Sequence, residues 1–529
     1  MAMDRHPTYE AMQATLPTEA PHQQLSWLKK RAVISSLAIL LACLGALVFV
    51  FAAKWPFTRT AMIKRLERAS SARVEIGSFS STYFPPGCVA SDVIFHTAPP
   101  ESKPHRDSTP VISIKKVVIE SSYHGLFSSP KRIQRIIADG AHIHVPSGGA
   151  NLQSRRNGDE TSLIIQAFHI QNAVVEVDGN DQGKEPLTFF VREALFRDLA
   201  SGRVVPFTMS LRNPLPPADL KIQGWIGPWR DERGSVRSTA ISGSAQLQHG
   251  NLSVFKSLAG SLSAQVNFSG TLARLQVSGE TQSPDFQVRE SRHRVPLTTQ
   301  FRGIVDLNSG DVLLPSLRAL LGKTRLNAAA EITGFPKRVK LDVEQGEGQV
   351  QDLILLFSSA PRPVMTGPIR FQTSIVLPPE KRPFKQRVQL TGAFNIGPAR
   401  FTSPVTRSHV DQLSERARGE KDKNGAQDEQ VLSDLKGRVS LQDGVSHFSS
   451  VSFFVPGASA MMHGTYNLMD KRVSFHGKMR MEATVSKATT GAKSFFLKLL
   501  DPFFKKKNAG AEVPVSMQGT YGHTHFLPD

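Results

Sequence analysis

A short strand-and-turn unit recurs along this chain and limits its possible folds more than any other feature. Four segments share the pattern G-x-x-x-L-x-x-G in full or in part: GSAQLQHG (243–250), GIVDLNSG (303–310), GRVSLQDG (437–444) and GTYNLMDK (464–471). In the third copy Val439 and Leu441 alternate with polar residues, so both side chains face one side of a strand. The Gln-Asp-Gly that follows predicts a turn, because glycine accepts a positive φ. The repeat therefore predicts consecutive antiparallel hairpins.

The alternation is clearest in the last third of the chain. Tyr466 and Leu468 lead into a turn around 470–471, and four apolar residues follow with one parity: Val473, Phe475, Met479 and Met481. Lys471, Ser474, Lys478 and Arg480 mostly take the other parity. This pattern predicts a meander with one apolar face and one polar face. The residues expected to face lipid are Val439, Leu441, Tyr466, Leu468, Val473, Phe475, Met479 and Met481.

Short segments rich in valine and isoleucine extend the strand pattern toward the N-terminus. Strands are expected in 71–79, 113–121, 141–146, 173–179 and 219–227. Helical patterns are scarce, and they fall near 58–70, 129–137, 255–259, 351–358, 411–418 and 492–500. So few helices cannot cover a large apolar sheet face. The face must therefore pack against a second sheet or line an open groove.

One uncharged run predicts a membrane span. Residues 32–53 are 22 residues without a charge, bounded by Arg31 and Lys54, and Trp27 and Trp55 flank the run, where indole rings favour the membrane interface. At 1.5 Å per residue the run measures about 33 Å, enough for a hydrocarbon core of roughly 30 Å. A cleaved signal peptide is the alternative, but its apolar core is shorter, about 7–15 residues.

The charges beside the span do not decide its orientation. Within twenty residues the N-terminal side has three Lys or Arg residues and the C-terminal side has six. The positive-inside rule would keep the larger part in the cytoplasm, but long domains translocate largely regardless of charge. The residues alone leave the sidedness open.

Composition narrows the partners and the chemistry. The net charge of +19 is compatible with an anionic membrane surface. Nucleic acid is not expected, because no zinc-finger spacing, RNP-like strand or groove-reading basic helix is present. The two cysteines, Cys43 inside the apolar run and Cys88 outside it, are not expected to form a disulfide.

No catalytic motif is found. The chain contains no G-x-S-x-G, G-x-x-x-x-G-K-[ST], H-E-x-x-H or C-x-x-C sequence. Two H-x-H pairs, His142/His144 and His523/His525, have a spacing that places both rings on one strand face, but a third metal ligand is not evident. We therefore expect neither enzyme activity nor a cofactor.

Several segments follow the apolar run in a fixed order. They are MIKRLERASSARVEIGSFSSTYFPPGCVASDVIF (62–95), NPLPPADLKIQGWIGPW (213–229), 354–379, 388–404 and 435–507. In this order, which covers nearly all of 32–529, the chain resembles the AsmA-like family of membrane-anchored proteins. The resemblance implies an inner-membrane anchor with the N-terminus in the cytoplasm and a large periplasmic β-rich groove. It also implies a role in phospholipid traffic or outer-membrane assembly, and it offers no catalytic residues.

These observations predict a mainly β chain with one N-terminal transmembrane helix, an elongated antiparallel groove of repeated hairpins and a few short capping helices. The expected organisation is a disordered cytoplasmic tail (1–31), the span (32–53), an N-terminal β region with a leading helix (54–150), a central hairpin groove (151–410), a charged helix and loop insertion (411–434) and a C-terminal β region (435–529). Within the last region, 491–507 forms an amphipathic helix that either caps the sheet or lies on an anionic membrane.

The expected function is shielding of lipid acyl chains in the apolar groove, with membrane phospholipids as partners. The alternative is a scaffold or regulator of outer-membrane protein assembly that does not transport lipid. At ~13 residues per strand and turn and ~4.8 Å per strand, the groove reaches at most about 170 Å. An envelope protein partner, a homo-oligomer or a local task near the inner membrane therefore stay open.

Overall fold

The computed structural model describes most of the chain after residue 54. The described residues are 55–70, 72–96, 112–145, 163–178, 186–200, 202–228, 238–255, 257–307, 309–334, 336–402, 433–455, 457–481, 512–520 and 523–528. The contacts divide the chain into two units, residues 1–62 and 63–529.

The fold of the second unit is mainly β, as the sequence predicts. The strands are β1 (Arg73–Thr82), β2 (Gly87–His96), β3 (Ile112–Ser121), β4 (Lys131–Val145), β5 (Leu163–Val177), β6 (Leu187–Leu199), β7 (Val205–Pro214), β8 (Pro217–Ile226), β9 (Ala240–Asn251), β10 (Leu258–Ala259), β11 (Ser261–Thr271), β12 (Arg274–Val288), β13 (Val295–Asp306), β14 (Asp311–Leu321), β15 (Thr324–Thr333), β16 (Arg338–Gln349), β17 (Met365–Thr366), β18 (Pro368–Leu377), β19 (Gln389–Ile396), β20 (Arg400–Phe401), β21 (Ser433–Gln442), β22 (Val445–Val455), β23 (Ala458–Asn467), β24 (Arg472–Met481), β25 (Glu512–Thr520) and β26 (His523–Pro528).

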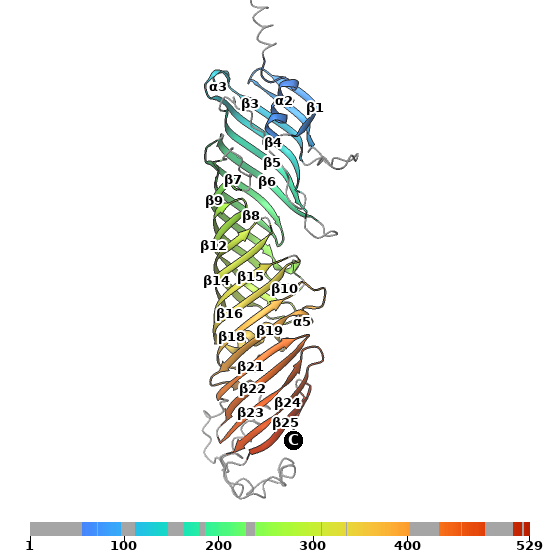
Figure 1. Ribbon diagram of the computed structural model, residues 1–529, viewed down its shortest axis with the longest axis vertical. Helices are drawn as coiled ribbons and strands as arrows, with labels where there is room; N and C mark the ends of the chain where they lie inside the picture. Colours follow the sequence, from blue (N-terminus) through green and yellow to red (C-terminus); the bar gives the residue numbers. More distant parts are fainter. Residues whose placement is uncertain are drawn as a thin grey trace, which may run out of the picture. The chain divides into compact units, whose positions relative to one another are not determined.

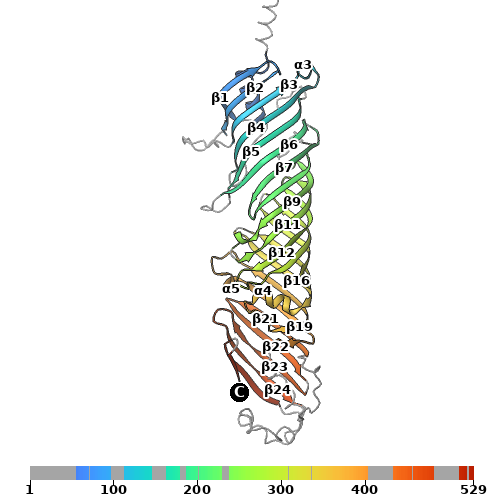
Figure 2. The same ribbon diagram turned by 180° about the vertical axis from the view of Figure 1, so that it is seen from behind.

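Nearly all of these strands belong to one sheet. β17 and β20 form a separate two-stranded sheet, and the other 24 strands are linked by hydrogen bonds, with β10 joined through its short pairing to β12. From β5 onward each long strand pairs with the long strand before it and the one after it, so the sheet grows by one hairpin at a time. Figures 1 and 2 show these strands side by side in sequence order.

The prediction of a purely antiparallel sheet is wrong at one junction. β4 and β5 pair in parallel, with Lys131 opposite Leu163 and Val145 opposite Val177. Every other strand pairing of the described residues is antiparallel. A parallel pair needs a connection that crosses back to the starting edge, and the alternation of apolar residues carries no information about strand direction. The sheet is therefore mixed.

The helices of the described residues are few and short. They are α2 (Arg59–Ser70), α3 (Tyr123–Phe127), the 3-10 helix η2 (Leu252–Val254), α4 (Val350–Phe357) and α5 (Phe384–Arg387). α2 and α4 confirm the helices expected at 58–70 and 351–358. The helix expected near 129–137 is wrong, because that segment forms the start of β4, where strand pairing buries Ile133. The helix expected near 255–259 is also wrong for the described residues there, because Phe255 follows η2 as its C-cap and Leu258–Ala259 form the short strand β10.

Several predicted segments lie outside the described residues. These are the tail at 1–31, the span at 32–53 with Trp27, the charged insertion up to residue 432, and the amphipathic segment at 491–507. Ser433 and Asp434, expected at the end of that insertion, already belong to β21. Among the helices that the structure describes, none has the length and apolar character that a membrane crossing needs.

Candidate functional site

One row of uncharged residues crosses the whole large sheet from strand to strand. Each member lies directly opposite the next in the strand register, and only Thr373 is polar. This apolar row consists of Phe79, Ala90, Val117, Ala138, Ile170, Ala194, Met209, Ile222, Ala245, Val266, Gly279, Phe301, Leu317, Ala328, Val343, Thr373, Gly392, Val439, Phe448, Gly464, Phe475 and Met517.

The neighbouring row has the opposite character. Its members lie one residue away from the apolar row on each strand, except on β16, where a bulge makes the separation two residues. Every member of it is polar or charged from β1 to β16. This polar row consists of Ser78, Ser91, Lys116, Asp139, Gln171, Glu193, Ser210, Lys221, Gln246, Gln265, Glu280, Gln300, Arg318, Asn327 and Gln345. Because adjacent side chains of a strand point to opposite faces, the sheet has one apolar face and one polar face from β1 to β16.

The apolar face is only partly shielded from water. Of the apolar row, Ala90, Ala138, Ala194, Ala328 and Val343 are buried, whereas the other members are half-buried. The strands mainly contact the strands to which they are hydrogen-bonded, and within the described residues the only other sheet is the small β17–β20 pair. No second sheet therefore covers this face in the described part of the chain.

Opposite edges of the sheet approach each other in its central part. Antiparallel strands turn at alternate edges, so the β12–β13 and β18–β19 connections lie at opposite edges. Yet Lys385 Nζ of the second connection lies 2.7 Å from Glu290 Oε2 of the first. The sheet must therefore curve strongly here. Since the apolar row is less exposed than the polar row, the apolar face is the concave one.

α4 covers part of the apolar face at one edge. Leu356 packs with Val295 and Leu321, and Val350 packs with Ile369 and Ile396. The side chain of Asp352 fixes the helix, because its Oδ2 accepts hydrogen bonds from Lys323 N at 2.7 Å and from Thr324 Oγ1 at 2.9 Å. Figure 2 shows α4 at the level of β16 along the sheet.

Glycines within strands make room for large side chains beside them. Gly464 lies between Phe448 and Phe475 in the apolar row, and the two ring centroids are 5.5 Å apart. A Cβ atom at Gly464 would lie 2.7 Å from Phe475 Cγ, and one at Gly243 would lie 2.9 Å from Phe268 Cζ. The first glycine of the repeat thus serves close side-chain packing. The second one serves the turn in two copies, with φ of 68° at Gly310 and 80° at Gly444, whereas Gly250 in the first copy lies within β9 and not in the predicted turn.

Two threonines face each other in a second row of the apolar face. Thr281 and Thr299 are directly opposite, and their Oγ1 atoms are 2.7 Å apart. In that row they lie between Ala264 and Ala319. The mutual hydrogen bond lowers the cost of placing two hydroxyl groups on an apolar surface.

The structure gathers most of the residues expected to face lipid on the apolar face. Val439 and Phe475 belong to the apolar row itself. Tyr466 lies opposite the buried Val473, and Met479 lies opposite Ala460 in a buried cluster. Leu441 has the parity of Val439 and is half-buried. Leu468 lies in the turn after β23, half-buried, and the side chain of Met481 is outside the described residues.

Trp55 is the one expected interface residue that the structure describes. Its side chain is 5% exposed, and its ring meets Phe57 edge-on, with centroids 5.9 Å apart.

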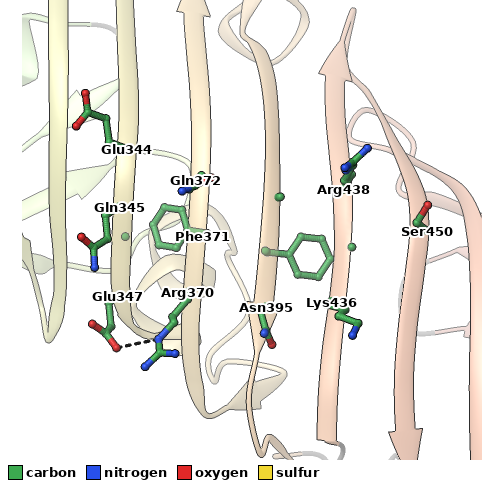
Figure 3. Close-up of a pocket in the computed structure, with 14 residues that line it drawn as sticks. Glu344, Gln345, Glu347, Arg370, Phe371, Gln372, Asn395, Lys436, Arg438 and Ser450 are labelled. Carbon is green, nitrogen blue, oxygen red and sulfur yellow. Dashed lines mark hydrogen bonds and ion pairs between the residues drawn. The ribbon is translucent and has the colours of Figure 1, made fainter.

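The polar face also has a hollow, but its lining gives no sign of chemistry. A depression of about 760 Å³ is bordered by Glu344, Glu347, Arg370, Lys436 and Arg438. Figure 3 shows Arg370 paired with Glu347, at 3.0 Å, and the ring of Phe371 extending toward the strand that carries Gln345. Both signs of charge line this open surface, which suits solvation rather than selective binding of one ion.

The two histidines of the first H-x-H pair lie close to carboxylates. His142 Nε2 lies 3.3 Å from Glu176 Oε1, and His144 Nε2 lies 3.2 Å from Asp178 Oδ2. Among the residues that the structure describes, no group of three or more His, Cys, Asp or Glu is arranged to hold a metal ion. The side chains of His523 and His525 are outside the described residues.

Cys88 is a free, buried cysteine. Its side chain is 1% exposed, and burial raises the pKa of the thiol to about 11, although the positive charge of Arg65 lowers it slightly. The thiol is therefore protonated and unreactive at neutral pH.

Sequence reasoning expected a continuous groove of hairpins but named its apolar residues only in the last third of the chain. The signal was present, because alternation recurs in most strands, yet a row also depends on register and bulges, such as the one between Phe448 and Val451. The approach of Lys385 and Glu290 left no signal in the sequence. Comparison with protein-family models and with curated proteins finds no match for this chain.

Proposed function

We propose that this protein holds lipid acyl chains along its concave apolar face and contributes to phospholipid transport or outer-membrane biogenesis. The single observation that supports this role is the apolar row, which continues without a charge from Phe79 in β1 to Met517 in β25. A soluble protein normally covers such a face with a second layer. Here most members of the row stay half-buried, so an apolar guest would remove water from them.

The energetics favour a guest that can lie anywhere along the row. Exposing an acyl chain to water costs about 0.8 kcal/mol per CH₂, so a sixteen-carbon chain faces a barrier on the order of 10 kcal/mol. A continuous apolar face lowers that barrier at every point without one tight site. The proposed movement is passive sliding, driven by a lipid gradient or by partner proteins, and it needs neither a catalytic residue nor a cofactor.

The proposed setting is the bacterial inner membrane. The uncharged run at 32–53 supports a single-pass anchor, and the resemblance to the AsmA-like family supports a cytoplasmic N-terminus and a periplasmic sheet. In this proposal Trp27 and Trp55 flank the anchor and lie at the membrane interface, so neither is needed for holding lipid.

Two matched double variants on neighbouring strands test the proposal. Phe301→Asp with Leu317→Asp changes two paired residues of the apolar row, and Gln300→Asp with Arg318→Asp changes the paired residues one position away on the polar face. Lipid bound to the detergent-purified full chain is quantified by mass spectrometry. We expect a several-fold loss of bound lipid in the first variant and none in the second.

A second measurement guards against misfolding of the first variant. A photo-crosslinking amino acid is placed at Phe301 or at Gln300 in an otherwise unchanged chain, and crosslinked lipid is compared. Crosslinks at Phe301 but not at Gln300 support the proposal. A wild-type protein that carries no stoichiometric lipid, or equal crosslinking at both positions, would instead favour a scaffold that docks an outer-membrane assembly factor.

A further inference from the structure

Two connections at one edge of the sheet present exposed aromatic side chains to solvent. The β1–β2 turn carries Tyr83 and Phe84, and α3 carries Tyr123 and Phe127. Phe84 is 88% exposed and Phe127 is 79% exposed, the highest fractions among the large hydrophobic side chains that the structure describes. These four residues are called the aromatic tip below. Phenylalanine side chains so far out of a fold make no contribution to its core.

The aromatic tip is held in place by contacts between its two connections. The ring centroids of Phe84 and Tyr123 are 5.8 Å apart, and Tyr123 Oη donates a hydrogen bond to Tyr83 O at 2.7 Å. Ser122 Oγ accepts from Gly125 N and so caps α3. The backbone of Ser121 also donates to Pro86 O at 2.8 Å. Both connections are thereby fixed with their phenylalanines pointing away from the sheet.

The charges next to the aromatic tip are positive. Lys131 and Arg132 begin β4 directly after α3, and both are exposed. The segment from Tyr123 to Arg132 contains no acidic residue, and His124 within it is also exposed. Glu120, at the end of β3, pairs with Arg135 at 2.6 Å. Aromatic rings beside cations match the interface of an anionic bilayer, where rings lie among headgroups and cations meet lipid phosphates.

We propose that the aromatic tip inserts into the headgroup region of an anionic phospholipid bilayer. This surface is separate from the apolar row, but the two are close in the chain, since Phe79 of the row lies near the end of β1 and Tyr83 lies in the turn that follows. Contact at the tip would bring the first strand of the row next to the membrane. The inference does not depend on lipid holding by the apolar face, although it gives that face a place of contact with the bilayer.

Site-specific fluorescence on the full chain in vesicles tests the inference. An environment-sensitive dye is attached to Phe84→Cys or Phe127→Cys in a Cys43→Ser background. Cys88 stays unlabelled, because it is buried and its thiol pKa is about 11. The matched controls are Phe357→Cys at the end of α4 and Met461→Cys in β23, whose native residues are 63% and 64% exposed. Vesicles contain phosphatidylethanolamine with or without phosphatidylglycerol.

With phosphatidylglycerol, we expect a blue shift and a several-fold drop in quenching by aqueous iodide at positions 84 and 127, and neither change at 357 and 461. Lys131→Glu with Arg132→Glu should reverse the shift at 127.

Equal quenching at all four positions would overturn the inference. Equal shielding without phosphatidylglycerol would overturn its anionic part. Shielding without vesicles that grows with protein concentration would assign the tip to a second copy of the chain. The amount of lipid bound to the same protein samples is also measured. Because bound lipid reports on the apolar face and dye shielding reports on the aromatic tip, failure of one proposal can be told from failure of the other.

Discussion

At the residue scale, glycines on the apolar face lie directly opposite large aromatic side chains. Gly464 between Phe448 and Phe475 is one instance, and Gly346 beside Phe371 is another, since a Cβ at Gly346 would lie 2.5 Å from the ring. Glycine in a strand interior weakens the strand and commonly marks a close approach. Here the two glycines leave room for the rings of Phe475 and Phe371 beside them, although they weaken their strands.

Adding a side chain at Gly464 should therefore cost more than adding one at an open glycine. A Cβ there would meet Ser474 O at 2.3 Å and Phe475 Cα at 2.6 Å. We expect Gly464→Ala to lower the free energy of unfolding by about 1–3 kcal/mol through overpacking. Gly334→Ala is the control, because only Pro336 O lies within 4 Å of its Cβ, and its φ of 81° should cost roughly 1 kcal/mol. Urea denaturation compares them, and equal losses would contradict the packing role.

The threonine pair makes a second residue-scale prediction. Thr281→Val or Thr299→Val alone leaves one hydroxyl without its partner, so each single change should lower stability by about 0.5–1.5 kcal/mol. The double change removes both hydroxyl groups and should cost less than the sum of the two. A double-mutant cycle measured by urea denaturation gives the coupling. Additive losses would mean that the two hydroxyl groups do not stabilise each other.

At the element scale, the ion pair between the two sheet edges makes the curvature testable. Both side chains are about half exposed, so the pair should contribute only about 0.2–1 kcal/mol. Its geometric effect is the better readout. We expect Lys385→Glu, which sets two carboxylates against each other, to widen the distance distribution between spin labels on the β12–β13 and β18–β19 connections.

The charge swap supplies the control for this prediction. Glu290→Lys combined with Lys385→Glu restores an attractive pair and should restore the original distance. An unchanged distance in the single variant would show that the edges are held together by other contacts.

Two neighbouring turns on one edge are tied together by an aspartate with a lowered pKa. Hydrogen bonding from Lys337, whose Nζ lies 2.6 Å from Asp311 Oδ1, is the main cause of the lowered pKa of Asp311, and Ser309 adds to it. A lowered pKa in the folded state stabilises the fold above the unfolded value of about 3.9, and this contribution disappears as pH falls through the folded pKa. Asp311→Asn should therefore lower the Tm at pH 7 but have a smaller effect at pH 3, as thermal scans can measure. A constant difference at both pH values would contradict the role of the charge.

The sequence predicts the type of most elements but not how they meet. Alternation of apolar residues predicts β1, β3, β8 and β24 because one face of each strand is apolar, and that depends only on local spacing. The parallel β4–β5 pair and the strand in place of a helix at 129–137 depend on partners far along the chain. The apolar row could be identified only from the register of every strand. The aromatic tip could be identified only from the exposure of Phe84 and Phe127 in the structure.

At the scale of the whole molecule, a continuous path behaves as steps in series. A single charge in the apolar row, as in Val266→Asp or Val439→Asp, should slow lipid transfer between donor and acceptor vesicles at least about tenfold, since about 1.4 kcal/mol of added barrier is tenfold. Stability losses at two such distant sites add. The two losses in transfer rate should not multiply, because both barriers lie on one path. If the two barriers are equal, the double variant should be slower than either single variant by only about twofold.

The control for that experiment is Gln265→Asp, one residue from Val266 and on the polar face. It should leave transfer unchanged. Fully multiplicative losses in the double variant, or equal losses in the control, would mean that lipids do not travel along a single row.

The hairpin organisation has a consequence for how such a chain can change in length. Removing or duplicating two consecutive antiparallel strands leaves the direction of every later strand as it was, so later turns stay on their own edges and α4 keeps its place beside Val295 and Leu321. Inserting a single strand between the connections that carry Glu290 and Lys385 would reverse the direction of every later strand. The two connections would then lie at the same edge, and the ion pair between opposite edges would be lost. Gene segments encoding whole hairpins are thus the natural unit of growth for this architecture, and its reach can evolve in steps of two strands.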